Sequence, residues 1–164
     1  MRLLCIDPGP VTSGVVEMNN MRVISAHAEM KNQDVLVKVA AGGFGQLLVE
    51  MIACYGKPVG RETFETCVWI GRFAQESGVA YPQYIYRRDV TLHLCNSVKA
   101  KDANIRQAIL DRYAATGGGK TPQVGTKKDP GPLYGVKSHS WSALALGVYW
   151  IERANYGQKL RYER

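Results

Sequence analysis

The sequence lacks a long apolar run and any closely spaced pair of cysteines. No apolar segment of the 164 residues approaches the ~20 residues that a spanning helix needs, so no membrane partner is expected. An acid and a Pro-Gly turn at 7–9 come too early for a signal peptide. Zinc sites usually need ligands in close pairs, whereas Cys5, Cys54, Cys67 and Cys95 are far apart. We therefore expect reduced cysteines in the core and a cytoplasmic protein.

Positive charge is in moderate excess. The chain has 21 Lys and Arg against 14 Asp and Glu, a formal net charge of +7. This excess favours a nucleic-acid partner without establishing one, because many basic proteins bind none. Hydrophobic residues make up 46%, and no repeat or linker divides the chain, so a single domain over residues 1–164 is the simplest account.

The spacing of apolar residues predicts alternating strands and helices. The expected strands are residues 2–7, 14–18, 22–27, 46–50 and 83–86, the first three forming an antiparallel meander. The expected helices are residues 33–41, 61–77, 103–113 and 138–154, with one or two helical turns at 89–96. Asp102 suits an N-cap, and Phe64, Trp69 and Phe73 have core spacing. A glycine- and proline-rich loop covers about 115–136, and loops this long are often functional.

Two carboxylates end buried strands. Asp7 closes the first strand and is followed at once by Pro8-Gly9, and Glu50 closes the strand at 46–50. Each has a structural alternative, since Asp-Pro-Gly is a common turn and a Glu can simply leave the core at a strand end. If the two strands are neighbours, both acids emerge at one edge, where their repulsion favours a bound cation.

A histidine and a serine lie near the start of the last predicted helix. His139 and Ser142 are three residues apart and are expected to share a helix face. Polar residues near a helix start are usually caps, so His139 alone is more easily structural. Together with the two acids, its imidazole makes a plausible divalent-cation site. His27 and His93 lack acidic neighbours at ligand spacing and are interpreted as structural.

Three short motifs stand out by their order and spacing. They are Ile6-Asp7-Pro8-Gly9 with Gly14, the strand Leu48-Val49-Glu50, and His139-x-x-Ser142-Ala143-Leu144-Ala145-Leu146. With these motifs the chain resembles the RuvC-type Holliday junction resolvases, and over nearly its whole length it looks like a phage-encoded branch, which would act in the host cytoplasm. The resemblance implies an α/β, RNase H-like fold with a central five-stranded mixed sheet flanked by helices. It also implies a homodimer that nicks two strands of like polarity at a four-way junction.

The resemblance assigns site residues by position. It makes Asp7, Glu50 and His139 metal ligands, with Ser142 as a further catalytic position where the family usually has an aspartate. Either Ser142 holds a metal-bound water, or another acid substitutes, or activity is weak. Two-metal hydrolysis with Mg²⁺ is implied, and an imidazole ligand favours tolerance of Mn²⁺. The candidate substitute acids are Glu62, Glu65 and Asp102.

Lysines and arginines are expected to grip the DNA backbone, because phosphate contacts dominate binding. Lys99, Lys101 and Arg106 match the region where the resolvases do so, and Lys127 and Lys128 in the long loop are a second candidate. Each lysine taken singly is more readily explained as a solvated surface charge. The sequence thus predicts a metal-dependent endonuclease that resolves four-way and other branched DNA.

Two other functions are compatible with these residues, and one further motif bears on the choice. One alternative is a related RNase H-like nuclease acting on forks, flaps or RNA–DNA hybrid. The other, motivated by Ser142, is a weakly catalytic protein that holds junctions. Gly117-Gly-Gly-Lys120-Thr121 resembles part of a P-loop, but Ala114 stands where the motif needs glycine and Pro122 follows. No nucleotide cofactor is therefore expected.

Overall fold

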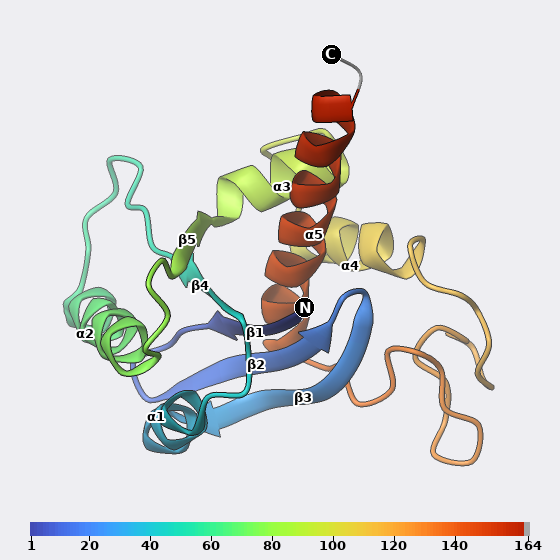
Figure 1. Cartoon of the computed structure of the whole chain (residues 1–164), viewed down its shortest axis with the longest axis horizontal. Coiled ribbons are helices and arrows are strands. Elements are labelled where there is room, and N and C mark those ends of the chain that lie inside the picture. The colour runs from blue at the N-terminus through green and yellow to red at the C-terminus, as the bar shows by residue number, and fades with distance from the viewer. Residues whose placement is uncertain (163–164) are drawn as a thin grey trace.

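The computed structural model describes the backbone of residues 1–162 and the side chains of residues 1–155. A five-stranded sheet lies between helices on both of its faces (Figure 1). The strands are β1 (Arg2–Asp7), β2 (Thr12–Asn19), β3 (Arg22–Lys31), β4 (Gln46–Met51) and β5 (Gln83–Tyr86). The helices are α1 (Asn32–Ala41), α2 (Arg61–Glu76), α3 (Arg87–Cys95), α4 (Asp102–Leu110) and α5 (Ser140–Tyr162).

The sheet is mixed, as predicted. Its strand order is β3-β2-β1-β4-β5. The first three strands form the expected antiparallel meander, while β4 pairs parallel to both β1 and β5. The carboxyl ends of β1, β4 and β5 therefore lie at the same edge of the sheet, and the loops and helices that follow them begin there.

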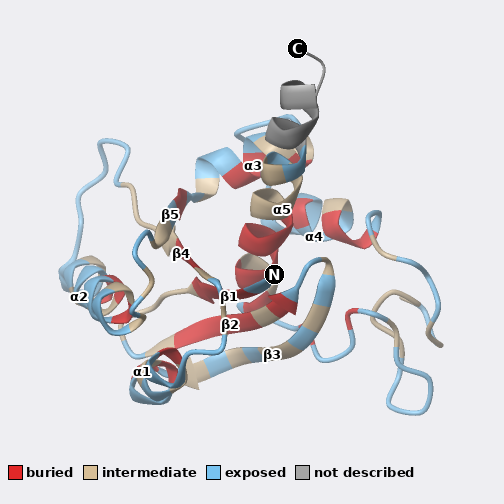
Figure 2. Cartoon of the chain, in the orientation of Figure 1, coloured by how far each residue is buried: buried red, intermediate tan, exposed pale blue. Residues whose placement is uncertain are grey.

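Side chains of the central strands alternate between two apolar clusters. Leu3 and Cys5 of β1 pack in the cluster of α3, α4 and α5, whereas Leu4 and Ile6 pack in the cluster of α1 and α2. Burial on both faces explains why β1 reads as a continuous apolar run (Figure 2). Helix α5 lies close against the sheet at Gly147, where a Cβ atom would collide with sulfur atoms of the sheet. None of the helices in residues 1–162 is long and apolar enough to cross a membrane.

Helix boundaries differ from the predictions at three places. Helix α3 is a full helix that begins at the end of β5, and α4 ends three residues earlier than expected. Asp102 is not the N-cap of α4 but its first residue; Lys101 precedes it, and the Lys101 N–H donates to Asn104 Oδ1 at 2.9 Å. Helix α5 begins after Ser138, whose φ of 46° interrupts a right-handed helix. His139 therefore precedes α5 instead of lying on it.

The predicted core of α2 is partly wrong. The buried stripe consists of Thr66, Ile70 and Phe73, at the i, i+4 and i+7 positions that face one side. Phe73 is buried and Trp69 is partly buried, but Phe64 lies on the opposite side of the helix and is 61% exposed. Several positions in α2 carry apolar residues, so spacing alone did not identify the side that packs on the sheet.

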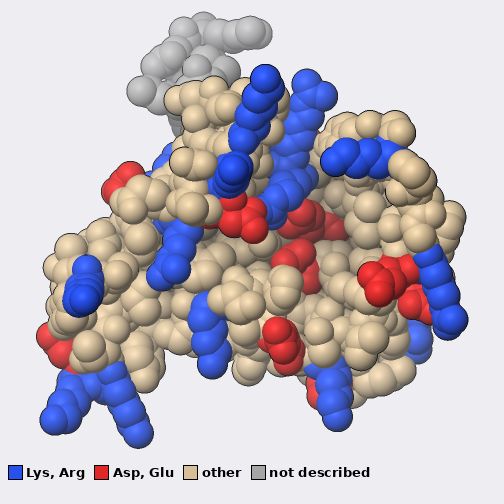
Figure 3. Space-filling model, turned by 180° about the vertical axis from the view of Figure 1, so that it is seen from behind, with Lys and Arg blue, Asp and Glu red and all other residues tan. Residues whose placement is uncertain are grey.

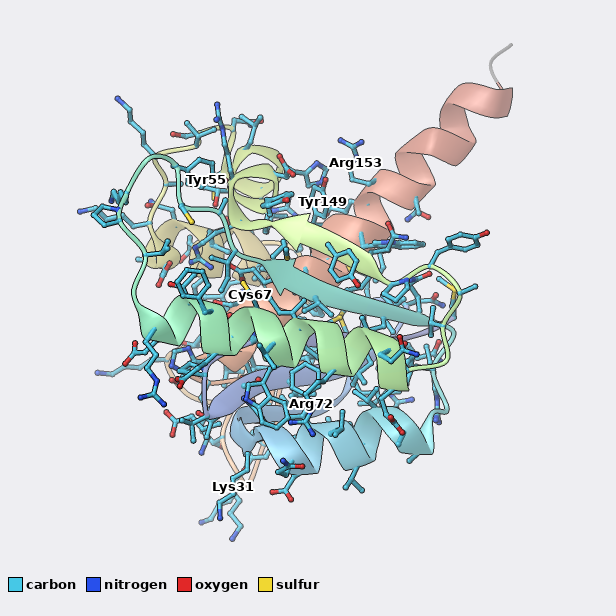
Figure 4. All side chains as sticks on the ribbon, turned by 90° about the vertical axis from the view of Figure 1, so that its left-hand side faces the viewer. Lys31, Tyr55, Cys67, Arg72, Tyr149 and Arg153 are labelled. Atoms are coloured by element: carbon cyan, nitrogen blue, oxygen red, sulfur yellow. The ribbon has the colours of Figure 1, made fainter. Side chains whose placement is uncertain are left out.

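All four cysteines are free, but only Cys5 is fully buried. Cys95 is half-buried, whereas Cys54 and Cys67 are exposed, which corrects the expectation of four core cysteines. Figure 4 looks onto α2 and shows Cys67 on this helix. Cys54 follows β4 in the segment that leads to α2, where no layer of the fold covers it.

Candidate functional site

Asp7 and Glu50 come together at the ends of adjacent strands. Cys5 lies opposite Leu48 and Ile6 lies opposite Val49, so Asp7 and Glu50 form the next pair in the register. Cys5 and Leu48, which lie two residues before Asp7 and Glu50 on their strands, pack toward α5. Because side chains alternate along a strand, Asp7 and Glu50 point to the same face of the sheet. Their side chains are only 19% and 16% exposed.

Burial makes both carboxyl groups harder to ionise, and the charge of Asp7 adds to this effect at Glu50. Burial, and then the charge of Asp7, raise the pKa of Glu50 to about 7, against the opposing effect of Arg87. Burial also raises the pKa of Asp7, while the charges of His139 and Arg87 counteract part of that rise. Two acids that share a poorly solvated site repel each other when ionised, and a positive partner relieves the repulsion.

His139 lies beside Asp7. Its Nδ1 atom is 3.5 Å from Asp7 Oδ2, and the side chain is 63% exposed. The turn that carries His139 rests against β2 at Gly14, the residue paired with Asp7 across the sheet. A Cβ atom on residue 14 would lie 2.5 Å from the His139 carbonyl oxygen, so the missing side chain allows this close approach. The Gly14 of the sequence motif thus positions the histidine.

Arg87 is a site residue that the sequence did not reveal. It follows β5 directly, and β5 neighbours β4, so Arg87 emerges at the same sheet edge as Glu50. Its guanidinium Nη1 is 3.7 Å from Glu50 Oε1 and 3.4 Å from Ser142 Oγ. Its Nη2 forms an ion pair with Asp102. Arg87 therefore joins β4, α4 and α5 at the centre of the site.

Three cavities meet at Arg87, which lines all of them. A cavity of about 240 Å³ contains Asp7 and Glu50, and one of about 540 Å³ contains His139 and Ser142. A third, of about 460 Å³, lies beyond Tyr55 (Figure 4), which it shares with the first. In the space-filling view of Figure 3, acidic side chains lie in a hollow bordered by lysines and arginines. Acids at the base and cations at the rim suit a polyanion that approaches with bound cations.

The three acids considered as partners for the site beside Ser142 differ in position. Asp102 is brought to the site through its ion pair with Arg87. Glu62 and Glu65 lie at the start of α2, and Glu65 pairs with Arg61 at 2.6 Å on the surface of that helix. Of the three acids, Asp102 is the one that the structure connects with Ser142, by way of the shared guanidinium.

The predicted DNA-binding residues lie in three parts of the structure: the 540 Å³ cavity, the segment before α4, and the long loop. Arg106 lines the 540 Å³ cavity, and the guanidinium of Arg106 lies 4.9 Å from the centre of the Trp141 ring. Lys137, which was not predicted from the sequence, lines the same cavity. Lys99 and Lys101 are exposed just before α4. Their role in binding DNA stays a prediction. The remaining pair, Lys127 and Lys128, lies in the long loop.

The long loop at 115–136 has no helix or strand within it, as predicted, but it is folded on itself. Gly125 and Pro130 form an isolated bridge, so Lys127 and Lys128 lie at the tip of a small closed turn. The N–H of Gly131 donates to the carbonyl of Val124 at 3.0 Å, which closes the base of this turn. The two lysines line none of the three cavities.

The donor chemistry of the site suits Mg²⁺ or Mn²⁺ in part. Two adjacent carboxylates that resist ionisation, with an imidazole close to one of them, are ligands for such cations. Within the described residues, however, no group of three His, Cys, Asp or Glu side chains is arranged to hold a metal ion. Glu50 contacts Arg87 while His139 contacts Asp7. Asp7 therefore lies next to Glu50, and His139 lies next to Asp7, but the three side chains do not gather around one point. Their role as metal ligands stays a prediction.

Comparison with known proteins bears on the fold. No family model and no curated protein matches the chain. Among solved structures, it is similar to Thermus thermophilus RuvC, with a TM-score of 0.64 and 15% identity over 96% of this chain and 97% of that one. It is also similar to T. thermophilus RuvC in complex with a Holliday junction substrate, with a TM-score of 0.60 and 16% identity over 96% of each chain. The protein therefore has a RuvC-like, RNase H-like fold, as predicted.

Proposed function

We propose that this protein is a structure-selective endonuclease that resolves four-way and other branched DNA by metal-dependent hydrolysis. The observation that carries the proposal is the adjacency of Asp7 and Glu50 at one sheet edge of a RuvC-like fold. One solved RuvC of this fold is in complex with a Holliday junction. The net charge of +7 and the cationic rim of the hollow supply the attraction for a DNA backbone.

The chain's own groups divide the work. Asp7 and Glu50, with the imidazole of His139, are the groups that would hold Mg²⁺, with Mn²⁺ tolerated. Such a cation, when bound, activates water and polarises the phosphate. Asp7 and Glu50 must lose their protons to act, and the burial that raises their pKa also keeps bulk water from competing for them. Ser142 presents a neutral hydroxyl at the site, and Arg106 and Lys137 line the cavity through which DNA would enter.

Assembly as a homodimer belongs to the same proposal. A homodimer would present two sites to the two strands of one junction, as strand-paired nicking requires. A single domain over residues 1–164 and a phage source in a host cytoplasm stay predictions. The neutral Ser142 favours a second candidate, a protein that binds junctions and cuts them poorly.

One experiment separates these functions. Purified protein is incubated with labelled four-way junction, fork, flap, duplex and RNA–DNA hybrid, with Mg²⁺, with Mn²⁺ or with chelator. We expect cutting of the junction with either cation and none with chelator. Preferential cutting of the hybrid would identify a different RNase H-like nuclease. Junction binding without cutting in either cation would identify the junction-binding protein, and activity confined to Mg²⁺ would refute the predicted tolerance of Mn²⁺.

A further inference from the structure

We propose that Arg87 is a further catalytic residue, whose guanidinium contacts the phosphodiester that is cut and supplies a fixed positive charge to it. This inference rests on the proposed function and adds a residue to the same site. Arg87 is the one residue that lines all three of the cavities described above. A phosphate that reaches Asp7 and Glu50 from the larger cavity must therefore pass beside it.

The guanidinium retains capacity for a ligand. An arginine has five N–H donors in a planar fork, which suits phosphate oxygens. In Arg87 the contacts with Glu50 at 3.7 Å and Ser142 at 3.4 Å are long. The third partner, Asp102, has a side chain that is 88% exposed, so water competes for that ion pair. The Arg87 side chain itself is 39% exposed, which leaves room for a phosphate to displace these weak contacts.

The backbone position of Arg87 is nevertheless fixed. Arg87 is the first residue of α3, and its backbone follows Tyr86, which pairs with Met51 of β4. The next residues of α3, Val90 and Leu94, are buried in the core. A charge mounted at the start of a packed helix, directly after the strand that neighbours β4, is preorganised for a reacting group. Such placement distinguishes Arg87 from the lysines of the long loop.

The charge balance of the site favours this role. Ser142 adds no negative charge, so Asp7 and Glu50 are the buried carboxylates that face the guanidinium, with exposed Asp102 beside it. The positive charge of Arg87 already counteracts part of their repulsion. In the reaction, the oxygen of water bonds to phosphorus, and one bridging P–O bond breaks. The leaving oxygen takes up a proton and the attacking water gives one up, while Arg87 stabilises the added charge on the non-bridging oxygens.

The test uses Arg87→Ala and Arg87→Lys, with Arg22→Ala as matched control. Arg22 is exposed and pairs with Asn19 at the end of the sheet opposite Asp7. Binding to a four-way junction is measured in chelator across a salt series, and cutting is measured at saturating protein with Mn²⁺. For Arg87→Ala we expect the slope of log K against log salt to fall by about 0.9, as for one lost phosphate contact. We expect the cutting rate to fall about 10²–10³-fold.

The lysine variant and a melting curve exclude a merely structural role. Arg87→Lys keeps the charge but loses the fork, so we expect the full salt slope with an intermediate cutting rate. Unchanged salt slope and rate in Arg87→Ala would overturn the proposal, and so would faster cutting, which would make Arg87 a competitor for Glu50. If the cutting rates of Arg87→Ala and Arg87→Lys fall in proportion to a decrease in their melting temperatures, the proposal is also overturned. If the wild type cuts no substrate, the proposed function fails, while the metal-free salt slope still decides whether Arg87 contacts phosphate.

Discussion

Asp7→Asn is expected to reduce junction cutting by about 10³-fold or more while leaving junction binding nearly unchanged. The amide has almost the same shape as the carboxylate, but it carries no charge to attract a cation. Because the side chain of Asp7 is only 19% exposed, it adds little to contact with the DNA backbone. The measurement is single-turnover cutting of a labelled junction with Mn²⁺, alongside binding in chelator.

The control for this variant is Asp34→Asn. Asp34 is an exposed acid in the first turn of α1, on the opposite face of the sheet from the site. The Asp34→Asn substitution removes the same charge but lies away from the candidate site, so cutting should remain at the wild-type rate. Wild-type cutting in Asp7→Asn would remove Asp7 from the reaction, whereas equal losses in both variants would indicate a general effect of charge.

Glu50→Gln is expected to stabilise the metal-free fold at pH 8 by as much as about 3 kcal/mol, and to have little effect near pH 4. The pKa of Glu50 rises from 4.5 to about 7 in the folded protein, so the folded state binds the proton more tightly than the unfolded chain does. The free energy of unfolding therefore falls as pH rises from about 4.5 to about 7 and then levels off. Glutamine cannot ionise, so this loss is absent from the variant.

The measurement is denaturant unfolding in chelator at several pH values from 4 to 8. Asp7 contributes a dependence of the same sign, since its pKa is also raised, so the variant should retain a smaller slope. The same variant should cut junctions poorly, because it lacks one of the two carboxylates. If the unfolding free energy of Glu50→Gln keeps the wild-type pH dependence, the pKa of Glu50 is not raised in the folded protein.

The acids of the site could be predicted from sequence because their signal is local. Asp7 and Glu50 each end an apolar run, and two central parallel strands that end in acids place them at one edge whenever they are adjacent. Gly14 of the first motif has a structural role that the sequence alone does not show, because its missing side chain allows the turn of His139 to lie against the sheet. That role depends on which backbone approaches Gly14, and only the fold supplies this.

Arg87 could not be found in the same way. The sequence shows only two arginines after a short strand, and nothing local states that β5 lies beside β4. The same limitation explains the errors in α2, where apolar residues such as Phe64 and Val68 lie on more than one face. Packing against the sheet determines which face is buried, and the i, i+4, i+7 pattern alone offered several solutions. Strand order and helix orientation are tertiary properties, and both errors come from them.

The measurement that tests the central claim most directly is an anomalous scattering map from crystals soaked in Mn²⁺. We predict a manganese peak within coordination distance of the carboxylates of both Asp7 and Glu50, absent from crystals of Asp7→Asn. A map with no peak at this pair would contradict a cation-dependent site at this edge of the sheet. So would manganese bound only elsewhere, such as beside His93, whose Nε2 lies 2.7 Å from Oε2 of Glu152 on α5.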